Sequence, residues 1–302
     1  MSQPLQQLLA IMARLRDPEN GCPWDKEQTY QTIVPYTLEE AYEVADAIAR
    51  EDYAELKDEL GDLLFQVVFY AQIAKEEGRF EFDDCAAAIN DKLIRRHPHV
   101  FADMNLDSSK AVLQNWEAIK TTERMASGKT SVLDNIPLAM PALSRAYKLQ
   151  KRCAQVGFDW PDVEGAWDKV QEEIQEVAEL PAGAAELEEE LGDLMFALVN
   201  VVRKQGFDPE KVMRQANQKF ERRFRQVEQA LVDQGSSPAQ SDLVVMDVLW
   251  EMVKIGLTVA MLFAATRLVK DLSWPAMLVG LVITMKVYWV VFAWRKVFHP
   301  VA

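Results

Sequence analysis

The 302-residue chain is poor in the residues that form covalent cross-links and many metal sites. Its three cysteines, Cys22, Cys85 and Cys153, lie far apart and have no Cys-x-x-Cys spacing. This pattern argues against a disulfide framework, a zinc site and a redox pair. Residues 1–20 also lack the basic start and the continuous apolar run of a signal peptide. We therefore expect a protein of the reducing cytoplasm.

Basic residues are also scarce, because 33 lysines and arginines stand against 47 acidic residues, for a formal net charge of −14. An acidic surface repels nucleic acid, and no basic patch as large as a binding face interrupts it. Glycine and proline are few and scattered, at 12 and 13 residues. We therefore expect a helix-rich globular protein that does not bind a nucleic-acid polymer.

Apolar residues recur at three- and four-residue spacing along most of the chain, and no alternating strand pattern competes with them. This period predicts an all-α fold built from amphipathic helices. The expected helices of the first half fall within 5–15, 38–48, 56–73, 85–94 and 112–124. Those of the second half fall within 142–155, 166–180, 186–204 and 209–232.

Polar breaks between the helices predict the domain organisation. We expect an N-terminal four-helix module at 1–102 and a second at 132–233, joined by a helical connector at 103–131. A polar linker at 234–250 then leads to a hydrophobic tail at 251–302.

The two helical series repeat one set of motifs in the same order, which indicates a duplicated module. The first series reads EEAYE at 39–43, ELGDL at 59–63 and KLIRR at 92–96. The second reads EEIQE at 172–176, ELGDL at 190–194 and KFERR at 219–223.

The acidic motifs place carboxylates on facing helices. Glu40 and Glu43 lie one turn apart on one helix face, and Glu59 and Asp62 do the same on the next helix. If the two helices pack antiparallel, the four carboxylates converge and require a cation. Oxygen ligands without thiolate or imidazole favour Mg²⁺, with Mn²⁺ as an alternative. The second series offers the equivalent set Glu173, Glu176, Glu190 and Asp193.

Acidic motifs of this kind also occur without a magnesium site. Glutamate-rich helices often present only a solvated face, but here the same acids border apolar residues twice. A di-iron carboxylate bundle needs Glu-x-x-His on two helices. The only histidines, His97, His99 and His299, do not follow a glutamate at that spacing.

Basic residues recur at a matched distance from the acids. Lys92 and Arg96 are four residues apart on one helix face, and so are Lys219 and Arg223. A metal-held phosphate needs cations on its far side. A single pair of this kind is most simply a pair of surface charges, but the repetition favours a triphosphate clamp.

Several further motifs, together with the acidic ones, resemble those of the MazG-type nucleoside triphosphate pyrophosphohydrolases of the all-α NTP pyrophosphatase superfamily. They are GCPWD at 21–25, QT at 28–29, RRHPHVF at 95–101, KRC at 151–153 and VGFDW at 156–160. The resemblance covers residues 1 to about 240. It implies Mg²⁺-dependent hydrolysis of an NTP or dNTP to the monophosphate and pyrophosphate, by a homodimer whose subunits complete each other's bundles.

The resemblance also implies roles for residues of the second copy. Its four metal-binding acids are those named above, and Glu172, which corresponds to Glu39, orients the attacking water or lies in the outer shell. Asn200, two helical turns after Asp193, is expected to bond the sugar or a phosphate.

Phe69 takes the place of Asn200 in the first copy, so we expect turnover chiefly in the second copy. The first copy is then weak, regulatory or structural. Trp160 and Trp24 are candidates to stack on a base, although tryptophans near helix starts commonly serve packing.

The tail has a different character. Its apolar segments 255–269 and 274–294 predict a membrane hairpin with both ends in the cytoplasm, although Lys286 fits this poorly. The segment 251–294 weakly resembles the last hairpin of subunit I of bacterial F-type ATP synthases. A natural fusion, a frameshift and an artificial junction all remain open, and the alternative is a buried hairpin that mediates dimerisation.

Two functions follow from these patterns. The first is an enzyme that converts nucleoside triphosphates to monophosphates. The second is a non-catalytic module that senses nucleotide or metal and is tethered to the membrane by residues 255–294.

Overall fold

A computed structural model describes residues 2–126 and 131–268, with only the backbone described at 124, 125 and 257–268. The chain divides into two compact units, Met1–Lys129 and Thr130–Ala302. The described residues form α-helices and one short 3-10 helix, with no strand among them. The all-α prediction is therefore confirmed.

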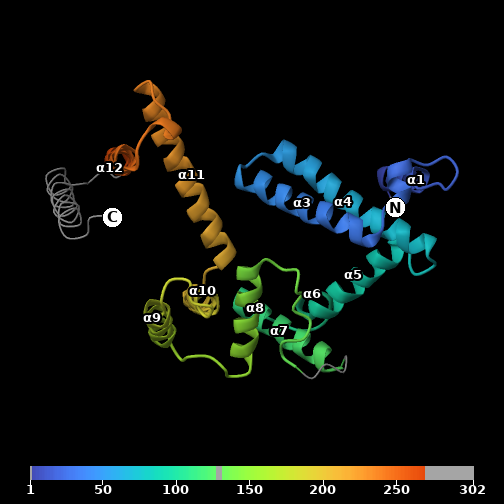
Figure 1. Cartoon of the computed structure of the whole chain (residues 1–302). Coiled ribbons are helices and arrows are strands. Elements are labelled where there is room, and N and C mark those ends of the chain that lie inside the picture. Colours follow the sequence, from blue (N-terminus) through green and yellow to red (C-terminus); the bar gives the residue numbers. More distant parts are fainter. Residues whose placement is uncertain (1, 127–130, 269–302) are drawn as a thin grey trace. The chain divides into compact units, whose positions relative to one another are not determined.

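Seven helices form the first unit (Figure 1). They are α1 (Gln3–Leu15), α2 (Pro23–Glu27), α3 (Tyr30–Ala49), α4 (Tyr53–Glu76), α5 (Phe82–Arg96), α6 (Pro98–Phe101) and α7 (Ser109–Ala126). The connector predicted at 103–131 thus contains α7, as the helical pattern at 112–124 indicated.

Helices α3 and α4 form a tight hairpin because local signals start each helix at a defined residue. Thr29 and Thr32 bond each other's backbone N–H in a capping box at the start of α3. The carboxylate of Asp52 accepts the backbone N–H groups of Ala54 and Glu55 at the start of α4. These caps satisfy N–H groups that have no partner within the helix. They leave only a short turn between the helices, which lie side by side (Figure 1).

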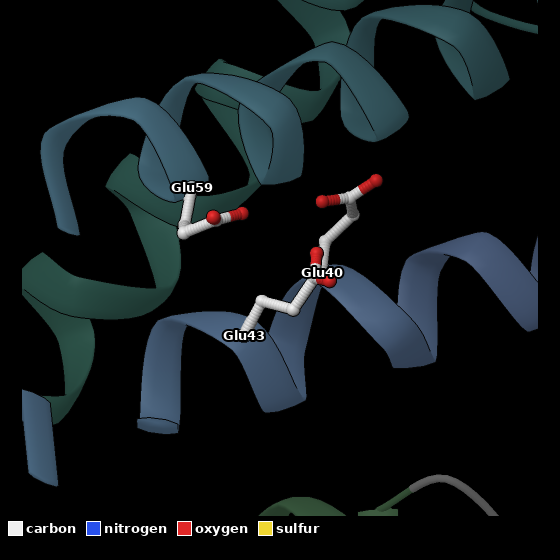
Figure 2. A group of neighbouring side chains, drawn as sticks. All are labelled: Glu40, Glu43 and Glu59. Carbon is white, nitrogen blue, oxygen red and sulfur yellow. The ribbon is translucent and has the colours of Figure 1, made fainter. Parts of the chain in front are cut away.

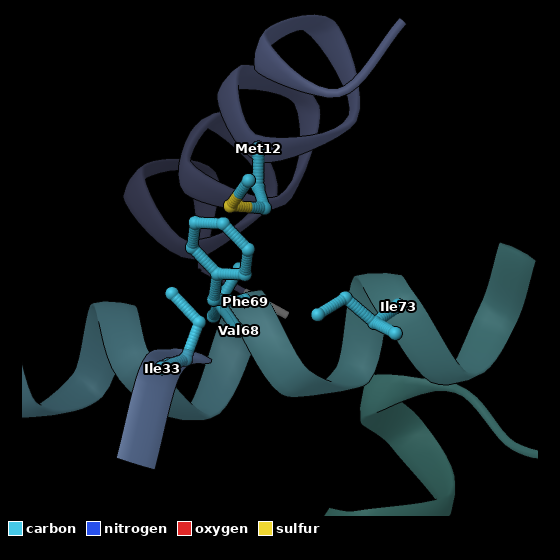
Figure 3. Packing of buried hydrophobic residues seen from close by; sticks show 5 residues of the cluster. All are labelled: Met12, Ile33, Val68, Phe69 and Ile73. Atoms are coloured by element: carbon cyan, nitrogen blue, oxygen red, sulfur yellow. The ribbon is translucent and has the colours of Figure 1, made fainter. Parts of the chain in front are cut away.

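The core of the first unit joins α1, α3 and α4. Met12, Ile33, Val68, Phe69 and Ile73 form one buried cluster, and each is at most 4% exposed. Figure 3 shows Met12 of α1 lying against the ring of Phe69. The core therefore lies at the end of the hairpin nearest α1, beyond the acidic residues.

The second unit repeats a hairpin of two long helices. Its elements are α8 (Ala142–Gln155), α9 (Glu164–Glu179), α10 (Leu187–Lys204), α11 (Pro209–Asp233), η1 (Pro238–Gln240) and α12 (Leu243–Leu268). Helices α9 and α10 pack on each other, and α8 packs on α10. Their buried cluster contains smaller side chains, Ala166, Val170, Ala197 and Val201.

A separate cluster joins α11 to α12, where Val227 and Leu231 pack against Leu249. The predicted linker 234–250 therefore holds η1 and the first two turns of α12. The first apolar segment predicted for the membrane, 255–269, falls almost wholly in α12. Among the described residues, no helix meets the length and hydropathy needed to span a bilayer. The second segment, 274–294, lies outside the described residues.

Candidate functional site

The first acidic group forms where α3 faces α4. Glu40 and Glu43 project from α3 and Glu59 from α4, so that one carboxylate oxygen of each lies within 4.8 Å of the others. Figure 2 shows these three side chains between the two helices. The fourth predicted ligand, Asp62, lies outside this 4.8 Å group, but its negative charge acts on Glu40.

Desolvation and the crowding of the acids raise the pKa of two of them. Burial raises the pKa of Glu40, and the charges of Asp62, Glu43 and Glu59 raise it further. The pKa of Glu59 is also raised, first by desolvation and then by Glu43 and Asp62. Like charges this close disfavour each other's ionised form, and a divalent cation relieves that repulsion.

The second acidic group forms in the same way between α9 and α10. Carboxylate oxygens of Glu173, Glu190 and Asp193 lie within 4.8 Å of one another. Glu176 is outside this set, but its pKa is raised by desolvation and then by the charges of Glu173 and Glu190. Three acids of each predicted set are therefore brought close together, and the fourth interacts with them through its charge.

Glu173 differs from the other acids of its group because it is only 3% exposed. Its Oε1 lies 2.6 Å from Nζ of Lys169, which also donates to the exposed Glu172 at 2.9 Å. Hydrogen bonds to Glu173 and then to Glu172 raise the pKa of Lys169. The other oxygen of Glu173, Oε2, is buried and has no hydrogen-bond partner among the described residues. A buried carboxylate oxygen without a donor suits a metal ion, so this donor set fits a divalent metal ion.

A pocket of about 480 Å³ adjoins the second acidic group. Its lining combines three acids, two of them from the acidic group, and two cations with apolar and aromatic side chains. The lining residues are Leu133, Leu149, Gln150, Cys153, Phe158, Asp159, Trp160, Lys169, Glu173, Asp193, Phe196, Ala197, Asn200 and Arg203. The predicted substrate-binding residues Asn200 and Trp160 are thus on its wall.

Asn200 is held by a cation that the sequence motifs did not single out. Both Nε and Nη2 of Arg203 donate to its Oδ1, at 2.9 and 2.7 Å. Nη2 of Arg203 also lies 2.6 Å from Asp159, which pairs with Lys204 at 3.4 Å. Burial alone would raise the pKa of Asp159, but the bond from Arg203 and the two positive charges lower it.

The corresponding place in the first unit is filled with apolar side chains. Phe69 stands where the second copy has Asn200, and Ile33 stands where it has Ala166. Phe69 and Ile33 are each only 1% exposed. Larger apolar residues therefore pack the first unit at the level where the second unit has a pocket.

The predicted cations make no ion pair with the acidic groups among the described residues. Lys219 and Arg223 are on α11 and are absent from the lining of the pocket within the described second unit. Lys92 is exposed on α5. Arg96 of α5 instead pairs with Glu123 of α7, with Nη2 2.6 Å from Oε2, and Arg95 adds a bond of 2.7 Å. These bonds from Arg96 and then Arg95 lower the pKa of Glu123 to about 2.

Comparison with known proteins agrees with this geometry. A model of the MazG nucleotide pyrophosphohydrolase domain matches residues 28–101 and 164–228, which hold the two acidic groups. A nucleoside triphosphate pyrophosphohydrolase of Escherichia coli K12 is 58% identical over 254 residues, covering 83% of this chain and 97% of the relative. The chain belongs to the MazG family.

Other MazG relatives align over a similar length. A protein of Thermotoga maritima named nucleoside triphosphate pyrophosphohydrolase/pyrophosphatase MazG is 43% identical over 251 residues, or 83% of this chain and 96% of the relative. The YabN protein of Bacillus subtilis is 46% identical over 248 residues, 81% of this chain and 50% of its own length.

Three residues of this MazG site were not indicated by the sequence motifs. Lys169 lies four residues before Glu173 and Arg203 three residues after Asn200, so helical spacing alone would have placed each pair on one face. Gln150 gave no such signal, because it lies on α8 and reaches α10 only through tertiary packing.

Proposed function

We propose that this chain hydrolyses nucleoside triphosphates, ribo or deoxy, to the monophosphate and pyrophosphate. The observation that carries the proposal is the second acidic group, which opens onto a pocket with aromatic walls and a size that suits a small molecule. Family membership and the names of the relatives support the same reaction.

Glu173, Glu190 and Asp193, with Glu176 beside them, would hold the metal, which we propose is Mg²⁺, with Mn²⁺ as a substitute. When bound, the ion balances charge on the phosphates and makes the phosphorus more open to attack by water. Glu172 is exposed next to these ligands and orients the attacking water. Lys169, which pairs with Glu172 and Glu173, keeps a positive charge near the leaving pyrophosphate.

The nucleoside occupies the apolar part of the pocket. The pocket offers the rings of Phe158, Trp160 and Phe196 for stacking on the base. An aromatic side chain can stack on any of the bases, because each base has a flat π-face. Asn200 is immobilised by Arg203 and contacts the sugar or a phosphate.

We also propose that the active form is a homodimer. Helices α9 and α10 expose Ile174, Leu191, Met195 and Leu198, each more than 40% exposed in the single chain. Apolar faces of this kind are normally covered by another helix. In a dimer, Lys219 and Arg223 of one subunit or the other would reach the triphosphate.

The second copy is proposed to carry the turnover, because it combines the acids with an open pocket. The first copy keeps Glu40, Glu43, Glu59 and Asp62 but fills the nucleoside position with Phe69. We propose a structural, weak or regulatory role for it.

The test is pyrophosphate release by the purified full-length chain with each NTP and dNTP in the presence of Mg²⁺. Activity with at least one of them is expected, and its absence with all of them would refute the enzyme. In the same assay, Glu176→Ala should abolish release while Glu43→Ala retains most of it. The opposite result would assign turnover to the first copy.

Binding without release would point to the alternative, a nucleotide- or metal-sensing module. Membrane contact through 255–294 stays a prediction. It is tested by sedimentation of the full chain with lipid vesicles, and recovery of the chain in the supernatant would argue against it.

A further inference from the structure

Gln150 of α8 is a buried polar residue with half of its amide unused. It is 7% exposed and lines the pocket of the second unit. Its Nε2 donates to the backbone oxygen of Phe196 on α10 at 2.8 Å. Its Oε1 is buried and has no hydrogen-bond partner among the described residues.

The bond to Phe196 determines which way the amide faces. A backbone carbonyl only accepts hydrogen bonds, so the atom next to it must be the NH₂ group. Oε1 is therefore a hydrogen-bond acceptor that is shielded from water and receives no hydrogen bond from the described residues. Leaving such a group unpaired costs more than replacing it by an apolar side chain of similar shape.

Core packing does not account for this glutamine. In the first unit, α1 packs on α4 as α8 packs on α10, and it buries Met12 against Phe69 at that contact (Figure 3). An apolar side chain is thus sufficient to join the two helices. The unpaired oxygen of Gln150 indicates a donor that comes from outside the chain.

None of the described neighbouring residues donates a hydrogen bond to this oxygen, so we assign the donor to a ligand. Leu149 and Cys153, which are close to Gln150 on α8, and Ala197, which follows Phe196 on α10, line the same pocket. The two cations of the lining are engaged elsewhere, since Lys169 pairs with Glu173 and Arg203 with Asp159.

The position of Gln150 selects the part of the nucleotide that reaches it. Phe196, to which its amide is bonded, is one of the three aromatic residues that we assign to the base, with Phe158 and Trp160. A donor that reaches Gln150 therefore lies on the aromatic side of the pocket. Among the nucleoside's donors, a base N–H suits a pocket walled by aromatic rings.

We infer that Gln150 is a specificity-determining residue, whose Oε1 accepts a hydrogen bond from an N–H group of the nucleobase. This inference rests on the proposed function. A site built around one buried acceptor rejects an analogue that lacks the matching donor, because the acceptor is then left unpaired.

The test compares nucleotides with and without one donor group on the base, either an amino group or a ring N–H, using the full-length chain and its Gln150→Met variant. The pairs are ATP with purine riboside triphosphate, CTP with pyrimidin-2-one riboside triphosphate, UTP with 3-methyluridine triphosphate, and GTP with inosine or 1-methylguanosine triphosphate. The wild-type chain should favour the N–H form of at least one pair by roughly 10–100-fold in kcat/KM. Gln150→Met should reduce that ratio to about one, chiefly by slowing the favoured nucleotide.

Controls separate this effect from a general loss of structure. Gln226→Met, at an exposed glutamine of α11, should keep the wild-type ratios. Gln150→Leu provides a second apolar replacement if the methionine variant does not fold by circular dichroism. Equal ratios in wild type and variant for every pair would overturn the inference. ATP is also compared with its 2′- and 3′-deoxy forms, and an effect of Gln150→Met in this comparison alone would overturn the inference by assigning the donor to the sugar.

The outcome for Gln150 is distinguishable from that of the proposed function. If no nucleotide releases pyrophosphate, the proposed reaction fails, and calorimetric binding of the same pairs with Mg²⁺ still decides whether Gln150 reads the base. If pyrophosphate is released but the ratios do not depend on Gln150, the reaction stands and this inference fails.

Discussion

Lys169 and Glu173 form an ion pair of 2.6 Å within one turn of α9, at the point where the acids of α9 and α10 meet. The ammonium group therefore neutralises the least exposed carboxylate of the group. A metal ion at Oε2 and the ammonium group at Oε1 compete for the charge of one carboxylate, so the lysine lowers the affinity of the acids for a metal before substrate binds.

Lys169→Met should accordingly tighten Mg²⁺ binding by the nucleotide-free chain. We expect about a fivefold lower Kd, equivalent to an ion pair of about 1 kcal/mol. Calorimetric titration with Mg²⁺ measures it, and Lys211→Met, at an exposed lysine of α11, is the matched control. An unchanged or weaker affinity in Lys169→Met would show that the lysine does not compete with the metal.

Asn200→Phe should close the nucleoside pocket by giving the second copy the residue of the first. The ring would take up space in the pocket that Asn200 now lines, and Arg203 would lose its bonds to Oδ1. We expect kcat/KM for the best nucleotide to fall about tenfold or more, mostly through KM. Steady-state pyrophosphate release checks this. Val212→Phe, at an exposed position of α11, should change the rate less than about twofold.

Phe69→Ala should destabilise the first unit without affecting the proposed site. Phe69 is 1% exposed in the cluster that joins α1, α3 and α4. Truncating a buried phenylalanine costs about 3–5 kcal/mol, because it removes contacts and leaves a cavity. Hydrogen exchange of α4 peptides should accelerate while that of α10 peptides stays constant. Normal protection of α4 in the variant would contradict the assigned core.

Glu123→Gln should weaken the attachment of α7 to α5 in a pH-dependent way. Bonds from Arg96 and Arg95 hold the pKa of Glu123 at about 2, below the ordinary 4.5. The carboxylate's contribution is therefore complete above pH 4.5 and is lost as the pH falls toward 2. After allowance for solvent screening we expect a loss of about 1 kcal/mol in the variant at pH 7. Urea unfolding measures it, and the difference between variant and wild type should vanish near pH 2.

Several features of the fold and site could be predicted because they depend on local spacing. The helical period of the apolar residues indicates the long helices up to α11, although α3 begins eight residues earlier than predicted and α12 begins inside the predicted linker. Thr29 and Asp52 cap α3 and α4 through bonds to residues two or three positions away. Glu40 with Glu43, and Glu190 with Asp193, share helix faces for the same reason. Each set of acids is then brought together by one helical hairpin, α3 with α4 or α9 with α10.

Contacts between distant residues could not be predicted in this way. Arg203 reaches Asp159 across 44 positions and Gln150 reaches Phe196 across 46, and neither pair has a periodic signature. The position of Lys219 and Arg223 depends on where α11 leaves α10, which their four-residue spacing does not specify.

The sequence by itself thus determined most of the helices, the repeated motifs and the two carboxylate sets, since each depends on residues that are close together in the chain. Only the tertiary structure decided that the second unit has a pocket where the first is filled. That outcome depends on the volume of Phe69 against that of Asn200, and on the helices that pack around them.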